Sequence, residues 1–535
     1  MNAPTGNPPG LRERRAARAG LAPAAPGEAR RRRMTLLVMC VATFMIQLDV
    51  TVVNVALPRI QADLGMTAGG LEWVISAYAL SLAALIPVGG ALGDHYGRKR
   101  VFLAGMTIFA LGSAACALSG SAAVLIASRA VQGVGGAAML ALTLSIITET
   151  FPPGVRARAI GTWAAVGGTG FGVGPVAGGV LLTFFGWASV FWVNVPMAVI
   201  GIAGTAVTVR ESRNPLSRRL DRPGALMSAA GLVAVTLGLI ESASHPWASL
   251  AVAGPLLIGA LLLAGFGLWE RRTRHAMVPP GLLRARSFAT SSLIYLISYS
   301  AFSGVLFYVT LFYQDVNGWT VLRTGLSWLL LNVPFLLVAQ LTGRLDLSPA
   351  AVIGAGCLAA AAGVFALSLA GLATPFVLTA AGYVACGAGF GALVPAITHV
   401  AMRDVPAGAS GTASGALNAS RQIGTSVGLA VLGTIGVAAA KSAWAGNAGR
   451  FPVPVRARAA GQAQNVGGAR IAAVTRSLGA AYRHPAAAAF VHGYHLAVGA
   501  GAACLVAAGL IAIIGLRRGG ASLTEQTGRV SVTEL

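Results

Sequence analysis

The chain has 535 residues, of which 56% are hydrophobic and only 10% are charged. Its mean hydropathy is +0.73, so there is too little polar surface for a soluble protein of this length. The formal net charge of +23 would suggest nucleic-acid binding in a soluble protein. Here, however, Lys and Arg lie mainly in short clusters between apolar runs, the pattern of loops in a polytopic membrane protein, so we expect no nucleic-acid partner.

Apolar runs long enough to cross a bilayer recur along the chain, since a membrane-spanning helix needs about 20 residues. The first run is too long for the apolar core of a signal peptide and contains Asp49, so we interpret it as a retained span. The sequence therefore predicts an all-α polytopic membrane protein with fourteen transmembrane helices. The predicted spans are 34–57, 71–92, 101–119, 122–148, 159–184, 188–209, 223–242, 248–269, 288–313, 324–344, 350–370, 373–401, 410–437 and 491–516.

Basic residues predict the orientation of these spans. With a cytoplasmic N-terminus, the inner segments hold 28 of the 39 Lys and Arg residues. The outer loops hold nine, and seven of these lie in one long loop, 438–490. Because short cytoplasmic loops are enriched in Lys and Arg, and long loops obey this rule less strictly, we expect both termini in the cytoplasm.

The order of the spans predicts two six-helix halves, 34–209 and 288–516, around a linker, 210–287, that carries two inserted helices. Residues 1–33 and 517–535 are expected to be cytoplasmic tails. The loop 438–490 belongs to the second half and contains a possible short amphipathic helix around 469–483. The segment "GALGDHYGRKR" after the second span has a weaker counterpart, "LTGRLDLSPAA", in the second half. Repeated halves place a substrate site between them near the middle of the bilayer.

Asp49, in "LDVTVVNVALP", follows about half a span of apolar residues. An acid inside a bilayer is expensive and is retained mainly for function. Burial favours the neutral form of a carboxyl group, so such an acid can take up and release a proton. We therefore interpret Asp49 as a proton carrier; the alternative is a structural acid that caps or pairs with a neighbouring helix.

Two basic motifs accompany this acid. The loop "GGALGDHYGRKRVF" contains glycines that allow close approach and charges that can form and break ion pairs at the inner face; the alternative is an ordinary basic inner loop. In "LIASRAVQGVGGAAM", Arg129 lies within a span and needs a partner, which we expect to be a proton-carrying acid or backbone carbonyls. Gln132 shares its helix face. The loop residues singled out are Gly90, Asp94, Gly97, Arg98, Lys99 and Arg100.

The segment "GGTGFGVGPVAGGV" (167–180) places poor helix formers in an uncharged run. The helix is nevertheless expected, because unpaired backbone groups are more costly in lipid than glycine is in a helix. Gly170, Gly174 and Gly178 then share one face, which allows a neighbouring helix to pack closely. Pro175 removes one backbone hydrogen bond and permits a bend. A role in helix packing alone is the alternative.

In this order, the segments resemble the major facilitator superfamily over nearly the whole chain outside the tails and the loop 438–490. "GALGDHYGRKR" resembles its inner-loop signature, "RAVQGVGGAA" its helix-four signature, and "GVGPVAGG", which includes Gly179, the helix-five signature of antiporters. The fourteen spans, "LDVTVVNVALP", "FWVNVP" and "LNASRQIGTSVG" resemble the fourteen-helix drug/proton antiporter branch.

The resemblance implies a monomeric transporter in a bacterial inner membrane that exports small amphiphilic compounds by alternating access as protons enter. Asp49 would be the coupling acid with Arg129 as its partner, and Asp94 with Arg98 would form the inner gate. The alternative is an importer or facilitator of the same fold. The candidate pocket residues are Asn54, Trp73, Tyr78, Gln132, Arg421 and Gln422. The alternative role for Trp73 is that of a membrane-interface anchor. The alternative role for Arg421 and Gln422 is to make contacts between helices.

Several features restrict the function further. The spans 324–344 and 410–437 contain no acid, which differs from exporters of polyvalent cations and favours neutral, anionic or singly charged lipophilic substrates. Glu149 and Glu241 lie at span ends, where we expect them to be solvated or capping. No P-loop, cysteine pair, metal cluster or nucleophile–base pair is recognisable, so we expect neither an enzyme nor a cofactor other than the transported proton.

Overall fold

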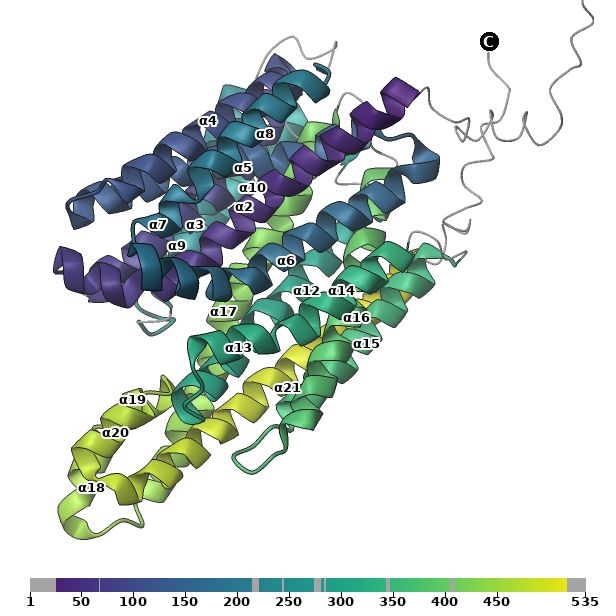
Figure 1. Cartoon of the computed structure of the whole chain (residues 1–535). Helices are drawn as coiled ribbons and strands as arrows, with labels where there is room; N and C mark the ends of the chain where they lie inside the picture. The colour runs from purple at the N-terminus through teal and green to yellow at the C-terminus, as the bar shows by residue number, and fades with distance from the viewer. Residues whose placement is uncertain are drawn as a thin grey trace, which may run out of the picture.

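A computed structural model of the chain describes residues 26–66, 68–213, 221–242, 245–273, 281–282, 285–342, 347–403, 405 and 409–516. Within these ranges every regular element is a helix, so the predicted all-α fold is confirmed (Figure 1). The helices run back and forth along one common direction. We call the end of the molecule at which α2 begins the first end, and the opposite end the second end.

The first group of helices packs around α2 and α5. α2 contacts α6 and α8, α5 contacts α3 and α4, and α4 contacts α8. Local sequence features set the helix boundaries. The chain turns between α3 and α4 at Gly97, whose φ of +109° favours glycine. At the start of α5, Ser121 accepts a hydrogen bond from the Val124 amide and so caps the helix. The members are α2 (Pro26–Leu64), α3 (Ala68–Tyr96), α4 (Arg98–Ala117), α5 (Ala122–Thr150), α6 (Pro153–Phe185), α7 (Ser189–Trp192) and α8 (Asn194–Thr208).

A second group packs in a similar way. α12 contacts α17 and α21, α15 contacts α16 and α21, and α14 contacts α16. The two groups meet where α17 packs against α3 and α5, and where α14 packs against α6. The members are α12 (Arg286–Leu311), the π-helical turn η1 (Phe312–Val316), α13 (Val321–Ser327), α14 (Leu329–Thr342), α15 (Pro349–Ser368), α16 (Phe376–Arg403), α17 (Ser410–Ala448) and α21 (Arg483–Leu516).

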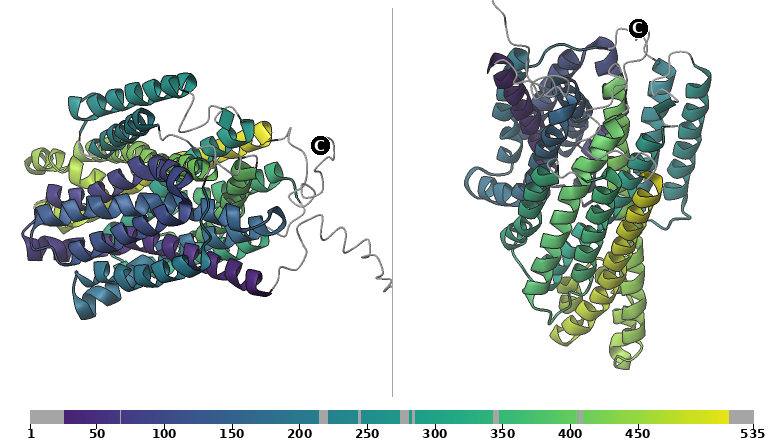
Figure 2. Two further views of the ribbon diagram at one scale, coloured as in Figure 1. Left: turned by 90° about the horizontal axis from the view of Figure 1, so that it is seen from above. Right: turned by 90° about the vertical axis from the view of Figure 1, so that its right-hand side faces the viewer.

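Two further helices, α9 (Arg222–Glu241) and α10 (Leu250–Arg272), pack against each other beside the bundle (Figure 2). α9 also contacts α3 and, less extensively, α17. In the connection between the pair, the Trp247 indole donates a hydrogen bond of 2.9 Å to the Thr434 hydroxyl of α17. The inserted pair therefore lies along the seam where α3 meets α17.

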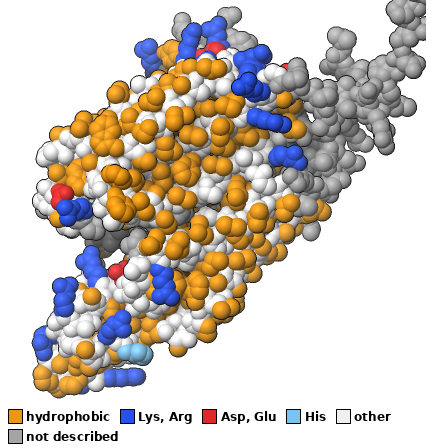
Figure 3. Space-filling view, in the orientation of Figure 1, with side chains coloured by type: hydrophobic (Ala, Val, Ile, Leu, Met, Phe, Trp, Pro, Cys, Tyr) orange, Lys and Arg blue, Asp and Glu red, His pale blue; other side chains and the backbone are white. Residues whose placement is uncertain are grey.

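The helix lengths and compositions agree with a multi-pass membrane protein. Among the described residues, thirteen helices are long and apolar enough to cross a membrane. α6, with 33 residues, corresponds to the remaining predicted span, 159–184. Figure 3 shows apolar side chains over the middle of one face, with Lys and Arg gathered at its two ends. This distribution fits an apolar layer crossed by the helices.

Around the loop 438–490 the helices are longer than the predicted spans. α17 continues to Ala448 and α21 begins at Arg483, so both helices extend well beyond the predicted span ends. Between them, residues 449–482 form a protrusion at the second end (Figure 1). The Trp444 indole is fully buried beneath it and donates to the Ala459 carbonyl at 2.7 Å. The protrusion consists of α18 (Val453–Ala460), α19 (Ala463–Gly467), α20 (Ile471–Leu478) and the 3-10 turn η3 (Ala480–Tyr482).

Candidate functional site

Asp49 lies at the centre of a buried polar network in the first group of helices. Its Oδ2 accepts a hydrogen bond of 2.6 Å from the Arg129 guanidinium. Its Oδ1 accepts from the amides of Gln132, at 2.8 Å, and Asn194, at 2.9 Å. Three hydrogen-bond donors therefore converge on this one carboxylate. The structure therefore brings together Asp49, Arg129 and Gln132, which the sequence singled out separately.

Arg129 is itself fully engaged. Besides Asp49, it donates to the Val74 carbonyl at 3.1 Å and to the Gln132 side-chain oxygen at 2.7 Å. Its guanidinium lies 4.2 Å from the ring centre of Tyr78, a cation–π contact. The side chains of Asp49 and Arg129 are 0% and 2% exposed, so water reaches neither charge in this conformation.

The network connects five helices. Asp49 is on α2, Val74 on α3, Arg129 on α5 and Asn194 on α8. Ser113 of α4 completes it by accepting a hydrogen bond of 2.7 Å from the Gln132 amide. Sequence reasoning did not assign a role to Ser113 or Asn194; the buried asparagine inside "FWVNVP" was the available signal for the latter, because a polar amide in a span needs a partner.

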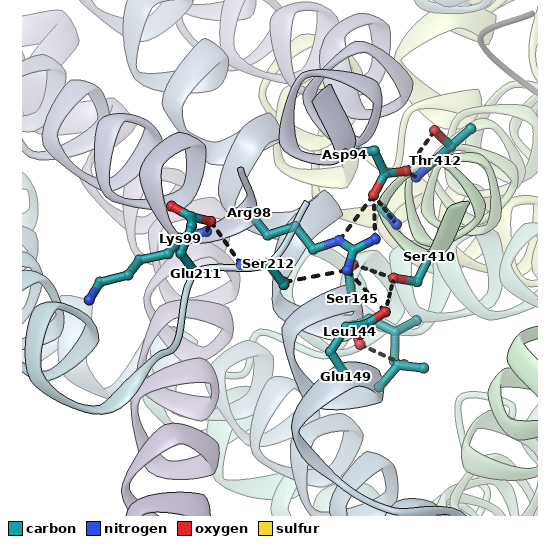
Figure 4. Close-up of polar contacts among 12 residues, drawn as sticks. Asp94, Arg98, Lys99, Leu144, Ser145, Glu149, Glu211, Ser212, Ser410 and Thr412 are labelled. Carbon is teal, nitrogen blue, oxygen red and sulfur yellow. Dashed lines mark hydrogen bonds and ion pairs between the residues drawn. The ribbon is translucent and has the colours of Figure 1, made fainter. Parts of the chain in front are cut away.

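A second network joins the two groups of helices at the first end (Figure 4). Asp94, near the end of α3, accepts two hydrogen bonds from Arg98, at 3.0 and 2.7 Å. It also accepts from the first turn of α17: from the Gly411 amide at 3.0 Å and from the Thr412 amide and hydroxyl at 2.7 and 3.0 Å. A carboxylate at a helix N-terminus is stabilised by the free backbone amides and by the helix dipole.

Arg98 connects the same end of the molecule to α5. Its guanidinium lies 2.9 Å from a carboxylate oxygen of Glu149, and the Ser410 hydroxyl donates to the same carboxylate at 3.0 Å. Ser410 also shares a hydrogen bond of 3.0 Å with Ser145 (Figure 4). Glu149 is exposed, as expected for an acid at a span end, and it also forms this ion pair. The pairing had no local sequence signal, because Arg98 is distant in the sequence.

The other two basic residues of this loop, Lys99 and Arg100, lie beside Glu211. The Lys99 and Arg100 amides donate to the carboxylate of Glu211 at 3.1 and 3.2 Å, so Glu211 caps the start of α4. A Cβ on Gly97 would lie 2.6 Å from the Glu211 carboxyl carbon. At Gly90, a Cβ would collide with the backbone of Gly411. These glycines allow α3 and its loop to approach their neighbours closely.

The glycine face of α6 packs against α2, the helix that carries Asp49. A Cβ on Gly174 would lie 2.6 Å from the Cβ of Thr51 and would overlap its hydroxyl. A Cβ on Gly170 would lie 2.8 Å from the Phe44 carbonyl oxygen, and one on Gly178 would lie 3.3 Å from Val55. Gly179 points elsewhere, with nothing within 4 Å. The helix continues through Pro175.

The remaining pocket candidates are not gathered in one place. Asn54 is exposed on α2, and Trp73 is 43% exposed near the start of α3. Tyr78 is buried beneath Arg129. Arg421 and Gln422 lie on α17 and are partly exposed. Only Tyr78 and Gln132 of this set therefore join the Asp49 network.

Polar contacts close the molecule between its two groups of helices at the first end. Besides the Asp94 network, the Gln340 amide of α14 donates to Thr162 of α6 at 2.9 Å. At the second end the surface is hollowed between the first group of helices and the protrusion (Figure 3). Among the described residues, polar contacts thus join the two groups of helices at the first end, and the visible face is hollowed at the second end.

Comparison with known proteins identifies the family. The multidrug resistance protein Stp of Mycobacterium tuberculosis is 37% identical over 75% of this chain and 75% of its own length. The tetracenomycin C resistance and export protein of Streptomyces glaucescens is 31% identical, with the same coverage of both chains. The crystal structure of the human organic anion transporter MFSD10 aligns with 90% of this chain and 99% of its own, with a TM-score of 0.60 and 14% identity, so it shares the fold.

The model of the Major Facilitator Superfamily matches residues 39–429. This range includes the Asp49 network, the Asp94 network and the glycine face of α6. The protrusion lies outside it. The match covers more than half of the chain and confirms the resemblance found in the sequence motifs, so this protein belongs to the Major Facilitator Superfamily.

Proposed function

We propose that the protein is a transporter that exports small amphiphilic compounds, antibiotics among them, from the bacterial cytoplasm in exchange for protons. The observation that carries the coupling is the buried contact between Asp49 and Arg129. Each oxygen of this carboxylate is occupied by donors from other helices. Adding a proton removes the charge that holds those donors, so protonation favours a different arrangement of the helices.

The burial of the pair sets the order of events. Because Asp49 and Arg129 are closed to water here, Asp49 exchanges its proton in another conformation of the cycle. The Asp94 network holds the first end closed by joining α3 to α17. We assign the first end to the cytoplasm, because the short basic loops lie there. Opening it requires these hydrogen bonds to break, which makes Asp94 and Arg98 the inner gate.

The names of two similar proteins support the outward direction of transport. Stp is named a multidrug resistance protein and the Streptomyces relative an export protein, and both are similar to this chain over three quarters of its length. A membrane potential of 100 mV provides about 2.3 kcal/mol for each charge that moves inward. One proton per cycle therefore supports a modest outward gradient of a neutral compound. We propose that a single chain performs the cycle.

Transport in inside-out membrane vesicles tests the proposal, with radiolabelled chloramphenicol as a neutral amphiphilic probe. Energised vesicles that contain the protein should accumulate the probe, and collapsing the proton gradient and the potential should prevent accumulation. Asp49→Asn should lose proton-driven accumulation. Asp63→Asn provides the matched control, because Asp63 is also on α2 and paired with an arginine, Arg59, but is 39% exposed. Full activity of Asp49→Asn would place the coupling elsewhere.

The same vesicles separate export from the alternative functions. An importer of the same fold would carry the probe out of inside-out vesicles, and a facilitator would equilibrate it without a gradient. Accumulation that survives removal of both the potential and the pH gradient contradicts coupled export. The pH inside the vesicles gives an independent measure of the exchanged proton. Adding the probe to acidified vesicles should raise the internal pH, because protons leave as the probe enters.

A further inference from the structure

Arg421 is a charged residue inside the second group of helices that has no polar partner. It lies eleven residues after the start of α17, which is about 16 Å along the helix axis and close to the middle of an apolar layer about 30 Å thick. None of its five N–H donors forms a hydrogen bond or ion pair with another residue of the described chain. Its one specific contact is the ring of Tyr299, 5.4 Å from the guanidinium carbon.

Arg129 shows how unusual this is. Both arginines lie within spans and over a tyrosine ring. Arg129 is 1% exposed and bonded to a carboxylate, an amide oxygen and a backbone carbonyl. Arg421 is partly exposed and bonded to none of these. An arginine that faces lipid without a partner is strongly disfavoured, which argues for a position of this guanidinium away from the lipid.

The surroundings of Arg421 offer donors and aromatic surface. The Gln422 amide and the Tyr299 hydroxyl are partly exposed and, like Arg421, form no hydrogen bond within the described chain. Tyr299 stacks on Tyr295 at 5.5 Å with an interplanar angle of 7°. It also meets the rings of Phe302 and Phe390 at 6.0 and 6.2 Å. Tyr295 and Phe390 are buried, so the cluster combines free hydrogen-bond donors with two partly exposed rings, those of Tyr299 and Phe302.

Acids are scarce around this charge. Between residues 286 and 516 the sequence contains three acids, Asp315, Asp346 and Asp404. None of them is within α17, and Asp315, the one that lies in the described part of the chain, forms no ion pair with Arg421. A guanidinium fork matches the two oxygens of a carboxylate, and a planar aromatic group can stack on tyrosine. We propose that Arg421, Gln422 and Tyr299 form a binding subsite for an anionic group, a carboxylate or phenolate, on an aromatic substrate. This inference rests on the proposed export function and names the substrate class.

A pair of dyes that differ by one methyl group tests the subsite. Tetramethylrhodamine carries a free carboxylate, whereas its methyl ester does not. Binding of each dye to the purified full-length protein in lipid nanodiscs is measured by fluorescence anisotropy, with no gradient present. The quantity of interest is the ratio of the dissociation constant of the ester to that of the acid. Arg421→Gln should lower this ratio about tenfold, the loss expected for a charge-assisted bidentate contact.

Arg323→Gln is the matched control. The Arg323 guanidinium also lies over an aromatic ring, that of Trp319 at 4.1 Å, but it is exposed on α13. Its loss should leave the ratio unchanged. Arg421→Lys keeps the charge but loses the bidentate guanidinium, so it should lower the ratio about threefold. If Arg421→Gln does not fold, this variant tests the subsite. An unchanged ratio in a folded Arg421 variant would overturn the subsite. Chloramphenicol accumulation in vesicles would then still stand, which separates this failure from failure of the proposed function.

Discussion

Gly174 gives the most demanding test of the contact between α2 and α6. An added Cβ would lie 2.6 Å from the Cβ of Thr51 and would overlap the Thr51 hydroxyl. Carbon atoms pack best at about 3.5 to 4.0 Å, so even Gly174→Ala must move α6 away from α2 by about 1 Å. Thr51 follows Asp49 by two residues on the same helix, so this displacement acts next to the polar network.

The expected cost follows from overpacking. Extra atoms in a tightly packed contact typically cost about 1 to 3 kcal/mol. If that cost applies to one state of the transport cycle and not to another, it changes their ratio by about 5-fold to 150-fold. Proton-driven accumulation of chloramphenicol by Gly174→Ala should therefore fall by at least about fivefold, and protons should leak through the variant when no substrate is present.

The same motif supplies graded controls. A Cβ on Gly170 would meet the Phe44 carbonyl at 2.8 Å, and one on Gly178 would meet Val55 at 3.3 Å, whereas Gly179 has nothing within 4 Å. Alanine substitutions should therefore impair transport in the order Gly174, Gly170, Gly178, with Gly179→Ala equal to the wild type. Accumulation and proton leak are measured in inside-out vesicles at matched protein levels. Equal impairment at Gly174 and Gly179, or none at either, would refute this reasoning.

Three further changes probe the remaining contacts. Asp94→Asn removes the charge from five hydrogen bonds. It should favour the state with the first end open by about 2 kcal/mol, which raises the population of that state about 30-fold. Maleimide labelling of the variant Ser145→Cys, at a buried position, should rise by the same factor, and unchanged labelling contradicts the gate. Asn194→Asp replaces a donor to Asp49 with a second carboxylate and should reduce accumulation at least about tenfold, whereas normal transport would show that the donor is dispensable. Glu211→Gln weakens the cap of α4 and should destabilise the purified protein by about 1 kcal/mol, seen as a lower unfolding temperature; an unchanged temperature would assign no stability to this cap.

The length of the apolar runs was sufficient to predict the long helices, because a span in lipid must satisfy its backbone internally and so leaves a long apolar run in the sequence. The limits were predicted less well where helices continue into water. α17 extends to Ala448 and α21 begins at Arg483, and the alanine-rich, arginine-bearing turns beyond the bilayer do not resemble a span. Within the protrusion, α20 lies inside the stretch 469–483 where the sequence predicted an amphipathic helix. The placement of the protrusion on the bundle depends on buried contacts such as that of Trp444 with Ala459, which no local pattern encodes.

The charged residues of the sites were easier to find than their partners. Asp49 and Arg129 stand out because charges are rare in spans. The sequence left two kinds of partner open for Arg129, an acid or backbone carbonyls, and the structure shows both, Asp49 and the Val74 carbonyl. Asn194 and Glu149 carried no comparable signal, since a neutral amide and an acid at a span end are both common. Their roles depend on which helices the fold brings together, and this information is spread over the whole chain.

The distribution of charge gives the two groups of helices different tasks. In the first group the buried acid and arginine are paired with each other, so neither of these two charges is free to attract a substrate. In the second group Arg421 has no such partner, and its charge is available to an anion. Export of a monovalent anion in exchange for one proton moves two positive charges inward, so a potential of 100 mV contributes about 4.6 kcal/mol per cycle, twice the value for a neutral compound. Export of a monovalent cation for one proton moves no net charge and gains nothing from the potential. An unpaired arginine in the second group would therefore favour anionic substrates, for which exchange with one proton supports the steepest outward gradient.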